Sequence, residues 1–120
     1  MKSNKRMSIA FAFLICLAGC AAGPQKPSAP LTAEHFSNDV MAGKKLFSQH
    51  CAACHGAGAQ GTTRAPSLQT ASVQGMSDDA LVRFLTDGDL RKGMPSWSRL
   101  PEERRWQLTH YLKSLSKSGS

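Results

Sequence analysis

The side chains with the clearest chemical potential lie together in one short run, Cys51-Ala52-Ala53-Cys54-His55. Two cysteines three residues apart share one face of a helical turn. Their thiols can therefore form thioethers with the two vinyl groups on one edge of a porphyrin. His55 follows directly and can present an imidazole nitrogen to iron at the ring centre. This spacing is the attachment pattern of c-type haem, and it predicts one covalently bound haem c with His55 as its proximal axial ligand.

Three other uses of the cysteines fit the sequence less well. A thioredoxin-like redox pair needs a βαβ context, and no alternating β-branched run surrounds this pair. A zinc site of this kind normally takes four ligands in paired clusters, and the chain has no second pair. The remaining cysteines, Cys16 and Cys20, belong to the N-terminal segment described below, so a disulfide framework is not expected either.

Met94 is the predicted second axial ligand of the iron. It stands in the run Arg91-Lys92-Gly93-Met94-Pro95-Ser96-Trp97. Gly93 lets the chain come close to a haem face, and Pro95 fixes φ and stiffens the loop. A thioether is a soft ligand that favours ferrous iron and raises the reduction potential relative to a second histidine. Trp97 is expected to pack beside the haem or, equally well, in the protein core.

The other methionines and histidines outside the N-terminal segment are weaker ligand candidates. Met76 stands just before a predicted helix and is expected to pack, and Met41 is expected to be partly buried on the first helix. His50 shares a turn with the attachment motif and cannot reach the opposite face of the ring. His35 stands at the end of a linker, and His110 is expected on the polar, solvated side of the last helix.

The first twenty residues have the composition of an export signal. Lys2, Lys5 and Arg6 form a positive start, and an apolar stretch follows. This stretch, residues 7–22, is shorter than the roughly 20 residues that span a bilayer, so an uncut transmembrane helix is the weaker alternative. Residues 17–20, Leu-Ala-Gly-Cys, resemble the lipobox of bacterial lipoproteins. That resemblance implies cleavage before Cys20 and acylation of its thiol, which would attach the protein firmly to a membrane. In the alternative reading, Cys20 is an ordinary residue near a standard cleavage site.

The chain divides into four predicted segments. Residues 1–19 are the lipoprotein signal peptide, and residues 20–35 are a lipidated N-terminus and proline-rich tether that cannot build a core. Residues 36–116 are the folded domain, and residues 117–120 are a disordered tail. Loss of Lys2, Lys5 and Arg6 with the signal takes the formal net charge from +7 to +4. This small positive net charge, without a dense basic stripe, argues against nucleic acid as a partner. It is compatible with docking onto acidic proteins.

Hydrophobic periodicity predicts three helices, and no strand pattern appears. The first is expected to be capped by Asn38 or Asp39 and to run to about Cys51. The second is expected to be capped by Ser77 and to end near Gly88.

The third helix is expected to begin at Pro101, a good first-turn residue. Its apolar residues follow the i, i+3, i+4, i+7 spacing of a buried stripe at Leu108, Tyr111, Leu112 and Leu115. A folded unit of about 80 residues makes only a small core by itself, so the apolar haem is expected to complete it.

The region from Asp39 to Leu115 resembles the class I c-type cytochromes, in particular small bacterial monohaem members and the cytochrome c subunits or domains of membrane oxidases and dehydrogenases. The matching elements are Gly43 and Phe47 before Cys51-Ala-Ala-Cys-His55-Gly56, then Pro66-Ser67-Leu68, Gly93-Met94-Pro95 and Leu108-x-x-Tyr111-Leu112. The resemblance implies an all-α cytochrome c fold, with three main helices and loops around one covalently bound haem. It implies that the terminal helices cross closely and that the Pro66 carbonyl accepts a hydrogen bond from His55. It gives no expectation for residues 67–76.

The resemblance implies a one-electron carrier whose partners are redox proteins and, through the lipid, a membrane. No convergent acid, base or nucleophile set appears, so neither an enzyme nor a small-molecule substrate is expected. Two alternatives stay open: a sensor of small ligands, if Met94 does not bind the iron, and a dedicated cytochrome subunit of a larger oxidoreductase complex. Four basic residues are expected either to steer partners or simply to be solvated: Lys44, Lys45, Arg91 and Lys92.

The expected location is the bacterial cell envelope, on its periplasmic side. An aspartate after the acylated cysteine tends to retain Gram-negative lipoproteins at the inner membrane. Ala21 stands at that position, so the outer membrane is slightly favoured over the cytoplasmic membrane.

Overall fold

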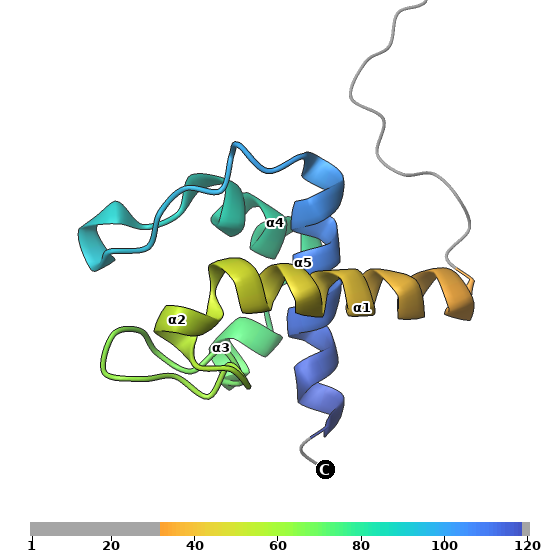
Figure 1. Cartoon of the computed structure of the whole chain (residues 1–120), viewed down its shortest axis with the longest axis horizontal. Helices are drawn as coiled ribbons and strands as arrows, with labels where there is room; N and C mark the ends of the chain where they lie inside the picture. Colours follow the sequence, from red (N-terminus) through yellow and green to blue (C-terminus); the bar gives the residue numbers. More distant parts are fainter. Residues whose placement is uncertain (1–31, 119–120) are drawn as a thin grey trace, which may run out of the picture.

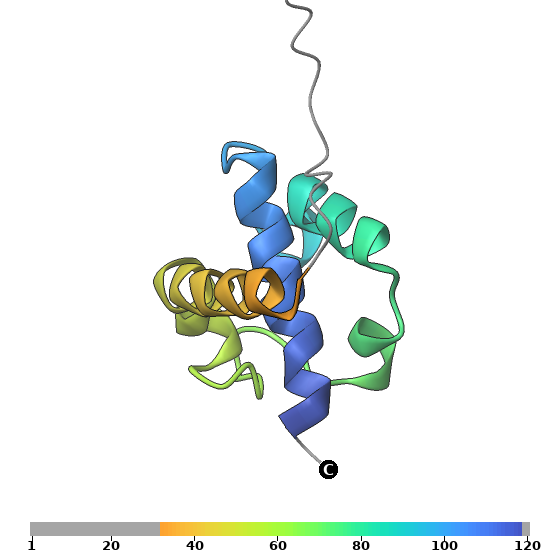
Figure 2. The same ribbon diagram turned by 90° about the vertical axis from the view of Figure 1, so that its right-hand side faces the viewer.

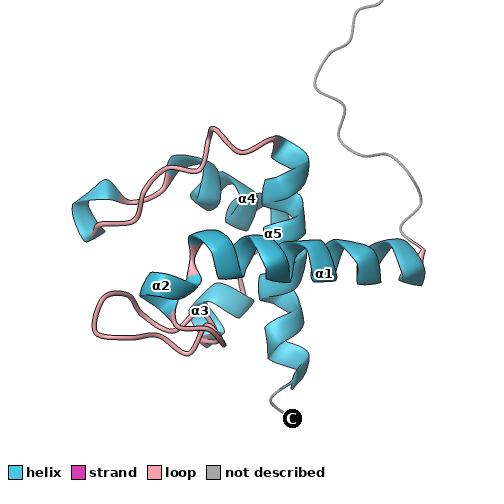
Figure 3. Cartoon of the chain, viewed as in Figure 1, coloured by secondary structure: helices cyan, strands magenta, loops and turns pink. Residues whose placement is uncertain are grey.

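The computed structural model describes residues 32–118, which form helices and loops without a strand (Figures 1 and 3). Three longer helices, α1 (Ala33–His50), α4 (Asp78–Asp87) and α5 (Glu102–Ser114), carry the fold. Shorter ones lie in the connections: α2 (Ala52–His55), α3 (Ala71–Gln74), and the 3-10 helices η1 (Leu90–Lys92) and η2 (Leu115–Ser118). The all-α fold class is confirmed. The predicted signal, Cys20 and most of the tether lie outside the described residues. No helix among residues 32–118 is long and apolar enough to cross a bilayer.

Helices α1 and α5 cross closely, as Figures 1 and 2 show. Gly43 makes this approach possible, because a Cβ atom there would lie 2.0 Å from the Gln107 carbonyl oxygen and 2.8 Å from Tyr111 Cβ. One turn further along α1, the Phe47 ring packs against the Tyr111 ring with 5.4 Å between the centroids. The close crossing that the family resemblance implied is therefore present.

The hydrophobic core lies where α1, α4 and α5 meet. Its buried members are Phe47, Ala59, Leu81, Leu85, Leu108, Tyr111 and Leu112. The stripe predicted on the last helix is confirmed at three positions, while Leu115 is only partly buried and packs against the core. The half-buried Met76 also packs there, as predicted.

Helix α1 begins earlier than the sequence rules predicted. Its N-cap is Thr32, whose hydroxyl accepts a hydrogen bond from the His35 backbone N–H at 3.3 Å, with Glu34 in the first turn. The prediction of Asn38 or Asp39 as the cap was wrong, since both residues stand inside the helix. The Asp39 carboxylate accepts a hydrogen bond from α5 instead of capping its own backbone.

The ends of α4 are as predicted, and the start of α5 differs by one residue. The Ser77 hydroxyl accepts a hydrogen bond from the Ala80 backbone N–H at 3.2 Å. Gly88 ends α4 with a φ of +68°, a conformation that L side chains rarely adopt. Pro101 occupies the N-cap position of α5 rather than its first turn.

Two predictions about burial were wrong. His110 was expected to be solvated, yet it is 8% exposed, and its Nδ1 lies 3.1 Å from Asp39 Oδ2. The reason is that α1 covers the polar face of α5 as well, so an unbroken run of α5 residues, Gln107 to Leu112, is buried. Met41 was expected to be partly buried, yet 69% of it is exposed, because α1 turns another face toward α5 at that position.

Candidate haem-binding site

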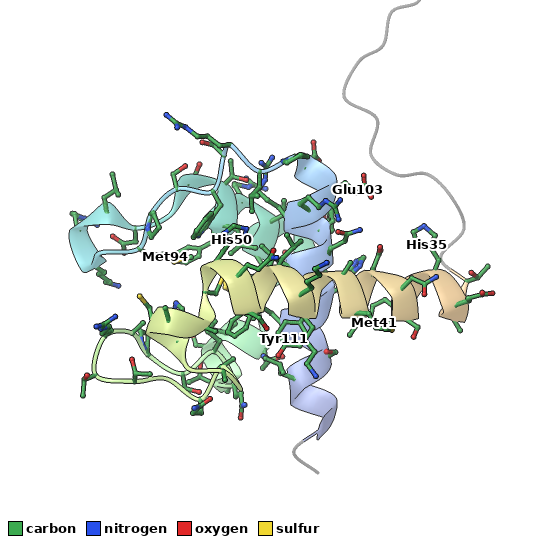
Figure 4. All side chains as sticks on the ribbon, viewed as in Figure 1. His35, Met41, His50, Met94, Glu103 and Tyr111 are labelled. Carbon is green, nitrogen blue, oxygen red and sulfur yellow. The ribbon has the colours of Figure 1, made fainter. Side chains whose placement is uncertain are left out.

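A cavity of about 420 Å³ opens beside the C-terminal end of α1. Every sequence-predicted site residue that the structure describes lines this cavity: Cys51, Cys54, His55, Pro66, Met94 and Trp97. Two segments line it, called here the His55 wall (residues 54–73) and the Met94 wall (residues 84–97). Figure 1 shows them on opposite sides of the end of α1. In Figure 4, Met94 and His50 lie near this end of α1, whereas Met41 and His35 lie further toward its start.

The two cysteines lie on a single helical turn. Cys51 ends α1 and begins α2, because its own N–H donates to the Phe47 carbonyl while its carbonyl accepts from the N–H groups of Cys54 and His55. Burial, and to a lesser degree the neighbouring Cys54, raises the pKa of the Cys51 thiol to about 11. This thiol is therefore protonated at neutral pH, which is the opposite of the low-pKa thiolate that a thioredoxin-like redox pair needs.

His55 is held in one orientation by the loop that follows it. Its imidazole is buried, and its Nδ1 lies 2.8 Å from the Pro66 carbonyl oxygen. A carbonyl only accepts, so Nδ1 carries the proton and Nε2 keeps its lone pair for a metal ion. The hydrogen bond that the resemblance implied is thus present in the structure.

Residues 56–68 fold back tightly to bring the Pro66 carbonyl to His55. The Gly61 N–H donates to the His55 carbonyl at 2.8 Å, and the Leu68 N–H donates to the Ala59 carbonyl at 2.9 Å. Gly61 adopts a φ of +88°, and a Cβ atom there would lie 2.5 Å from the Ser67 nitrogen. A glycine is required at this position both by its conformation and by this close approach.

Met94 stands in an irregular loop that α4 holds. Its backbone forms two hydrogen bonds with Asp89, of 2.9 and 3.0 Å, and three residues later the Trp97 N–H donates to the Leu85 carbonyl at 3.0 Å. Gly93 ends η1 with a φ of +81°. Gly88 lies against the backbone of Pro95, where a Cβ atom would meet the carbonyl oxygen at 2.5 Å.

The residues present fit a covalently attached haem. The cavity lies within the about 300–1,000 Å³ range of ligand and cofactor pockets. Apolar side chains of both walls line it, among them Leu68, Val73, Phe84 and Trp97. One wall offers an imidazole with a free Nε2 and the other a thioether, which is the donor set of a His/Met-ligated haem iron. Two thiols on one turn stand at the edge for attachment.

The structure adds lining residues that the sequence did not identify. Arg64, Ser72 and Val73 line the His55 wall. Residues 71–74 form α3, inside the segment for which the resemblance gave no expectation. Arg64 stands in a loop without any periodic pattern, so no sequence signal could have found it.

His50 also lines the cavity. Its ring lies 5.2 Å from the Trp97 ring, centroid to centroid, so it packs across from α1 onto the Met94 wall. Of the four basic residues proposed to steer partners, only Lys92 lines the cavity, and all four are exposed.

Comparisons with known proteins agree with this geometry. Residues 38–112 match the family model described as cytochrome c oxidase, cbb3-type, subunit III. Cytochrome c6 from Cyanidium caldarium is 30% identical over 95 aligned positions, covering 73% of this chain and 84% of the relative. Cytochrome c6 from Porphyra purpurea is 30% identical over 123 aligned positions, covering 97% and 98%. No solved structure matches. The chain therefore belongs to the c-type cytochromes that this family model describes, and it is a monohaem electron-transfer protein with covalently bound haem c.

Proposed function

We propose that Cys51 and Cys54 form the two thioethers to the haem, that His55 and Met94 are its axial ligands, and that the protein is a one-electron carrier in the cell envelope. The observation that supports this assignment best is the pairing across the cavity. A histidine whose Nδ1 is already bonded to Pro66 stands in one wall, and a methionine stands in the other.

The protein's contribution to electron transfer is to keep one geometry in both oxidation states. The bound haem supplies the one-electron couple. The hydrogen bond from His55 to Pro66 fixes the imidazole plane and tautomer. The Met94 thioether favours ferrous iron and occupies the sixth position. Thioethers from Cys51 and Cys54 would hold the haem at this site, and Trp97 and Phe84, which line the cavity, would exclude water from it.

The same assignment argues against catalysis. Electron carriers of this family are generally not enzymes. With both axial positions taken by His55 and Met94, no coordination site is left for a substrate or a small gas. We therefore propose neither a small-molecule substrate nor a sensory role.

A role as a subunit of a larger complex is the second candidate, and the description of the matching family model favours it. It changes the electron acceptor and leaves the haem chemistry unchanged. Gentle solubilisation of native membranes, followed by affinity isolation of the tagged cytochrome, distinguishes a complex subunit from a free carrier. Stoichiometric recovery of an oxidase would support the subunit role, and a cytochrome recovered alone would support a free carrier.

Cytochromes of this family exchange electrons with redox partner proteins. We propose that the partner surface is acidic and docks at the cavity rim. Arg64 and Lys92 line the cavity and are exposed, and Arg91, which precedes Lys92 in the sequence, is exposed as well. Lys92 is paired with Asp89 at 3.6 Å, so its charge is partly offset. Because exposed charges are screened by salt, the rate of electron exchange with an acidic partner should fall as ionic strength rises.

We propose further that Cys20 is acylated and anchors the protein on the periplasmic side of the envelope, with the outer membrane favoured. The lipid anchor rests on the lipobox resemblance of residues 17–20, and the preference for the outer membrane rests on Ala21 after the cysteine. The test is fractionation of cells that express the full chain or its Cys20→Ser variant. Membrane recovery of the first and release of the second would support lipid anchoring. Equal membrane recovery of both would contradict it.

The experiment that tests the axial ligands is the absorption spectrum of the purified ferric protein beside that of Met94→Ala. A weak far-red band from the methionine-to-iron bond should appear in the wild type and be absent from the variant. A high-spin wild-type spectrum without this band would mean an open sixth position, and a ligand-binding haem would become the better assignment.

A further inference from the structure

Helix α5 sends two basic side chains to the backbone at or just beyond the ends of the two cavity walls. Arg105 Nη1 lies within hydrogen-bond distance of three carbonyl oxygens at the end of the Met94 wall and just after it, those of Trp97, Ser98 and Leu100. Two helical turns further on, Lys113 Nζ donates to the carbonyls of Gln74 and Met76, which follow the His55 wall. Both side chains are half-buried.

We propose that Arg105 is a positioning residue for Met94, which keeps the thioether at the sixth position by holding the loop that carries it. The proposal rests on the axial role proposed for Met94. Among the residues of this loop that follow Met94, positions 95–100 form neither helix nor strand. Within the loop, the Trp97 carbonyl accepts a hydrogen bond from the Leu100 N–H at 3.0 Å, and Arg105 adds contacts from α5 to the carbonyls of Trp97, Ser98 and Leu100.

The Trp97 peptide is the point at which the loop is fixed. Its N–H donates to the Leu85 carbonyl on α4 at 3.0 Å, and its carbonyl oxygen lies 3.5 Å from Arg105 Nη1 on α5. On its other side, Met94 is held by the two backbone hydrogen bonds with Asp89. The chain between Asp89 and Trp97 is thus attached at both ends, and Met94 lies between the attachments.

Arginine suits this position better than lysine. A guanidinium presents several donors in a rigid plane, whereas an ammonium is a point charge on a flexible stem. For either side chain, hydrogen bonds from the ionised donor are roughly twice as strong as neutral ones. The Arg105 Nε is buried and has no hydrogen-bond partner among the described residues. An unpaired buried donor is costly, and the carbonyl contacts of Nη1 act against this cost.

Release of the loop would let Met94 leave the iron more often. An external ligand for the sixth position binds only the open form, so its apparent affinity rises in proportion to the population of that form. Imidazole is a suitable probe because it binds ferric haem and abolishes the methionine-to-iron band when it does.

The test is an imidazole titration of the ferric holoprotein, followed by the far-red band, in wild type, Arg105→Leu and Lys113→Met. Both variants lose one half-buried positive charge from α5 and a set of backbone contacts, Arg105 at the end of the Met94 wall and Lys113 just after the His55 wall. We expect Arg105→Leu to bind imidazole at least about tenfold more tightly than wild type, and Lys113→Met to stay within about twofold. Arg105→Lys should fall between Arg105→Leu and wild type, because it restores part of the contacts.

Equal changes in Arg105→Leu and Lys113→Met would overturn the proposal, since they would reflect general loss of stability. An unchanged affinity in Arg105→Leu, with the far-red band present in wild type, would overturn the positioning role and leave Met94 ligation intact. A wild type without the band would overturn Met94 ligation and the positioning role together. If Arg105→Leu does not accumulate, Arg105→Lys decides alone: a tighter imidazole complex than that of wild type supports the proposal, and an unchanged one overturns it.

Discussion

The two walls of the cavity are built by different means. The His55 wall is local: the attachment motif, His55 and its Pro66 acceptor lie within one short stretch of chain, and most of its hydrogen bonds join residues of that stretch. The Met94 wall is an irregular loop packed against its own helical start at Leu85, Thr86 and Gly88, and Arg105 of α5 reaches it from outside at the Trp97 carbonyl. In the proposed assignment, the thioethers of Cys51 and Cys54 join the haem to the side of the His55 wall, and a single coordinate bond from Met94 joins it to the other wall.

This difference indicates where the site is weakest. A local, covalently joined wall keeps its geometry even when the rest of the domain loosens. A loop tied to the haem by one coordinate bond opens first, because local openings follow the parts of a structure with the fewest stabilising contacts. We therefore expect disturbances of the fold to appear first as loss of Met94 ligation, with His55 still bound.

Removal of both attachment cysteines should have the largest effect. In Cys51→Ala with Cys54→Ala, the haem is no longer held covalently, and the small core shared by α1, α4 and α5 loses the apolar group expected to complete it. We expect no folded product, as judged by soluble yield and far-UV circular dichroism. A stable helical apoprotein would show that the domain does not need the haem, and the contrast between the walls would lose its basis.

Removal of Met94 should leave the fold and change the redox chemistry. Met94→Ala should lose the far-red band and lower the reduction potential on the order of 0.1 V, because axial ligands set haem potentials over a span of roughly 0.8 V and a thioether favours ferrous iron. The matched control is Met76→Ala, which removes a half-buried thioether that packs against the core. Loss of the band in both variants would contradict the assignment of Met94.

A pair of glycine substitutions compares the walls directly. Gly61 lies against Ser67 in the His55 wall, and Gly88 lies against Pro95 in the Met94 wall. Both glycines have a positive φ, and a Cβ atom on either would lie 2.5 Å from a backbone atom of its neighbour. Replacement by alanine should cost about 1–3 kcal/mol of unfolding free energy in each case from backbone strain alone. Thermal unfolding of the ferric proteins would measure this cost.

The spectra of the two glycine variants should differ although their stabilities do not. Gly88→Ala should weaken the far-red band, since it displaces the loop that carries Met94. Gly61→Ala should keep the band and shift the reduction potential, since it disturbs the hydrogen bond that sets the basicity of His55. If Gly61→Ala lost the band and Gly88→Ala kept it, the weaker wall would be the one that holds His55.

The sequence predicted the residues that line the cavity and the helices better than the contacts between helices. Cys51, Cys54 and His55, which the spacing singles out, all line the cavity, and the Ser77 cap and Gly88 stop follow from local backbone chemistry. The start of α1 was missed because Asp39 has a capping side chain that is used in a tertiary hydrogen bond. Arg105 could not be found in the same way, because its role depends on where residues 97–100 meet α5 in space. The burial of His110 was predicted wrongly, because the hydrophobic periodicity of a helix does not show that a second helix covers its polar face.

The smallest predicted effect comes from the caps of two helices, one beside each wall. The Ser77 hydroxyl caps α4, which supports the Met94 wall, at 3.2 Å from the Ala80 nitrogen, whereas the Thr70 hydroxyl caps the four-residue α3 at 3.5 Å from the Val73 nitrogen. Loss of an N-cap costs about 1 kcal/mol in a well-formed helix. Ser77→Ala should therefore cost about 1 kcal/mol of unfolding free energy. Thr70→Ala should cost less than half of that, because its bond is long and few residues depend on α3. Denaturant unfolding of the two ferric variants measures both values, and a larger cost for Thr70→Ala would mean that the His55 wall relies on α3 more than its local hydrogen bonds indicate.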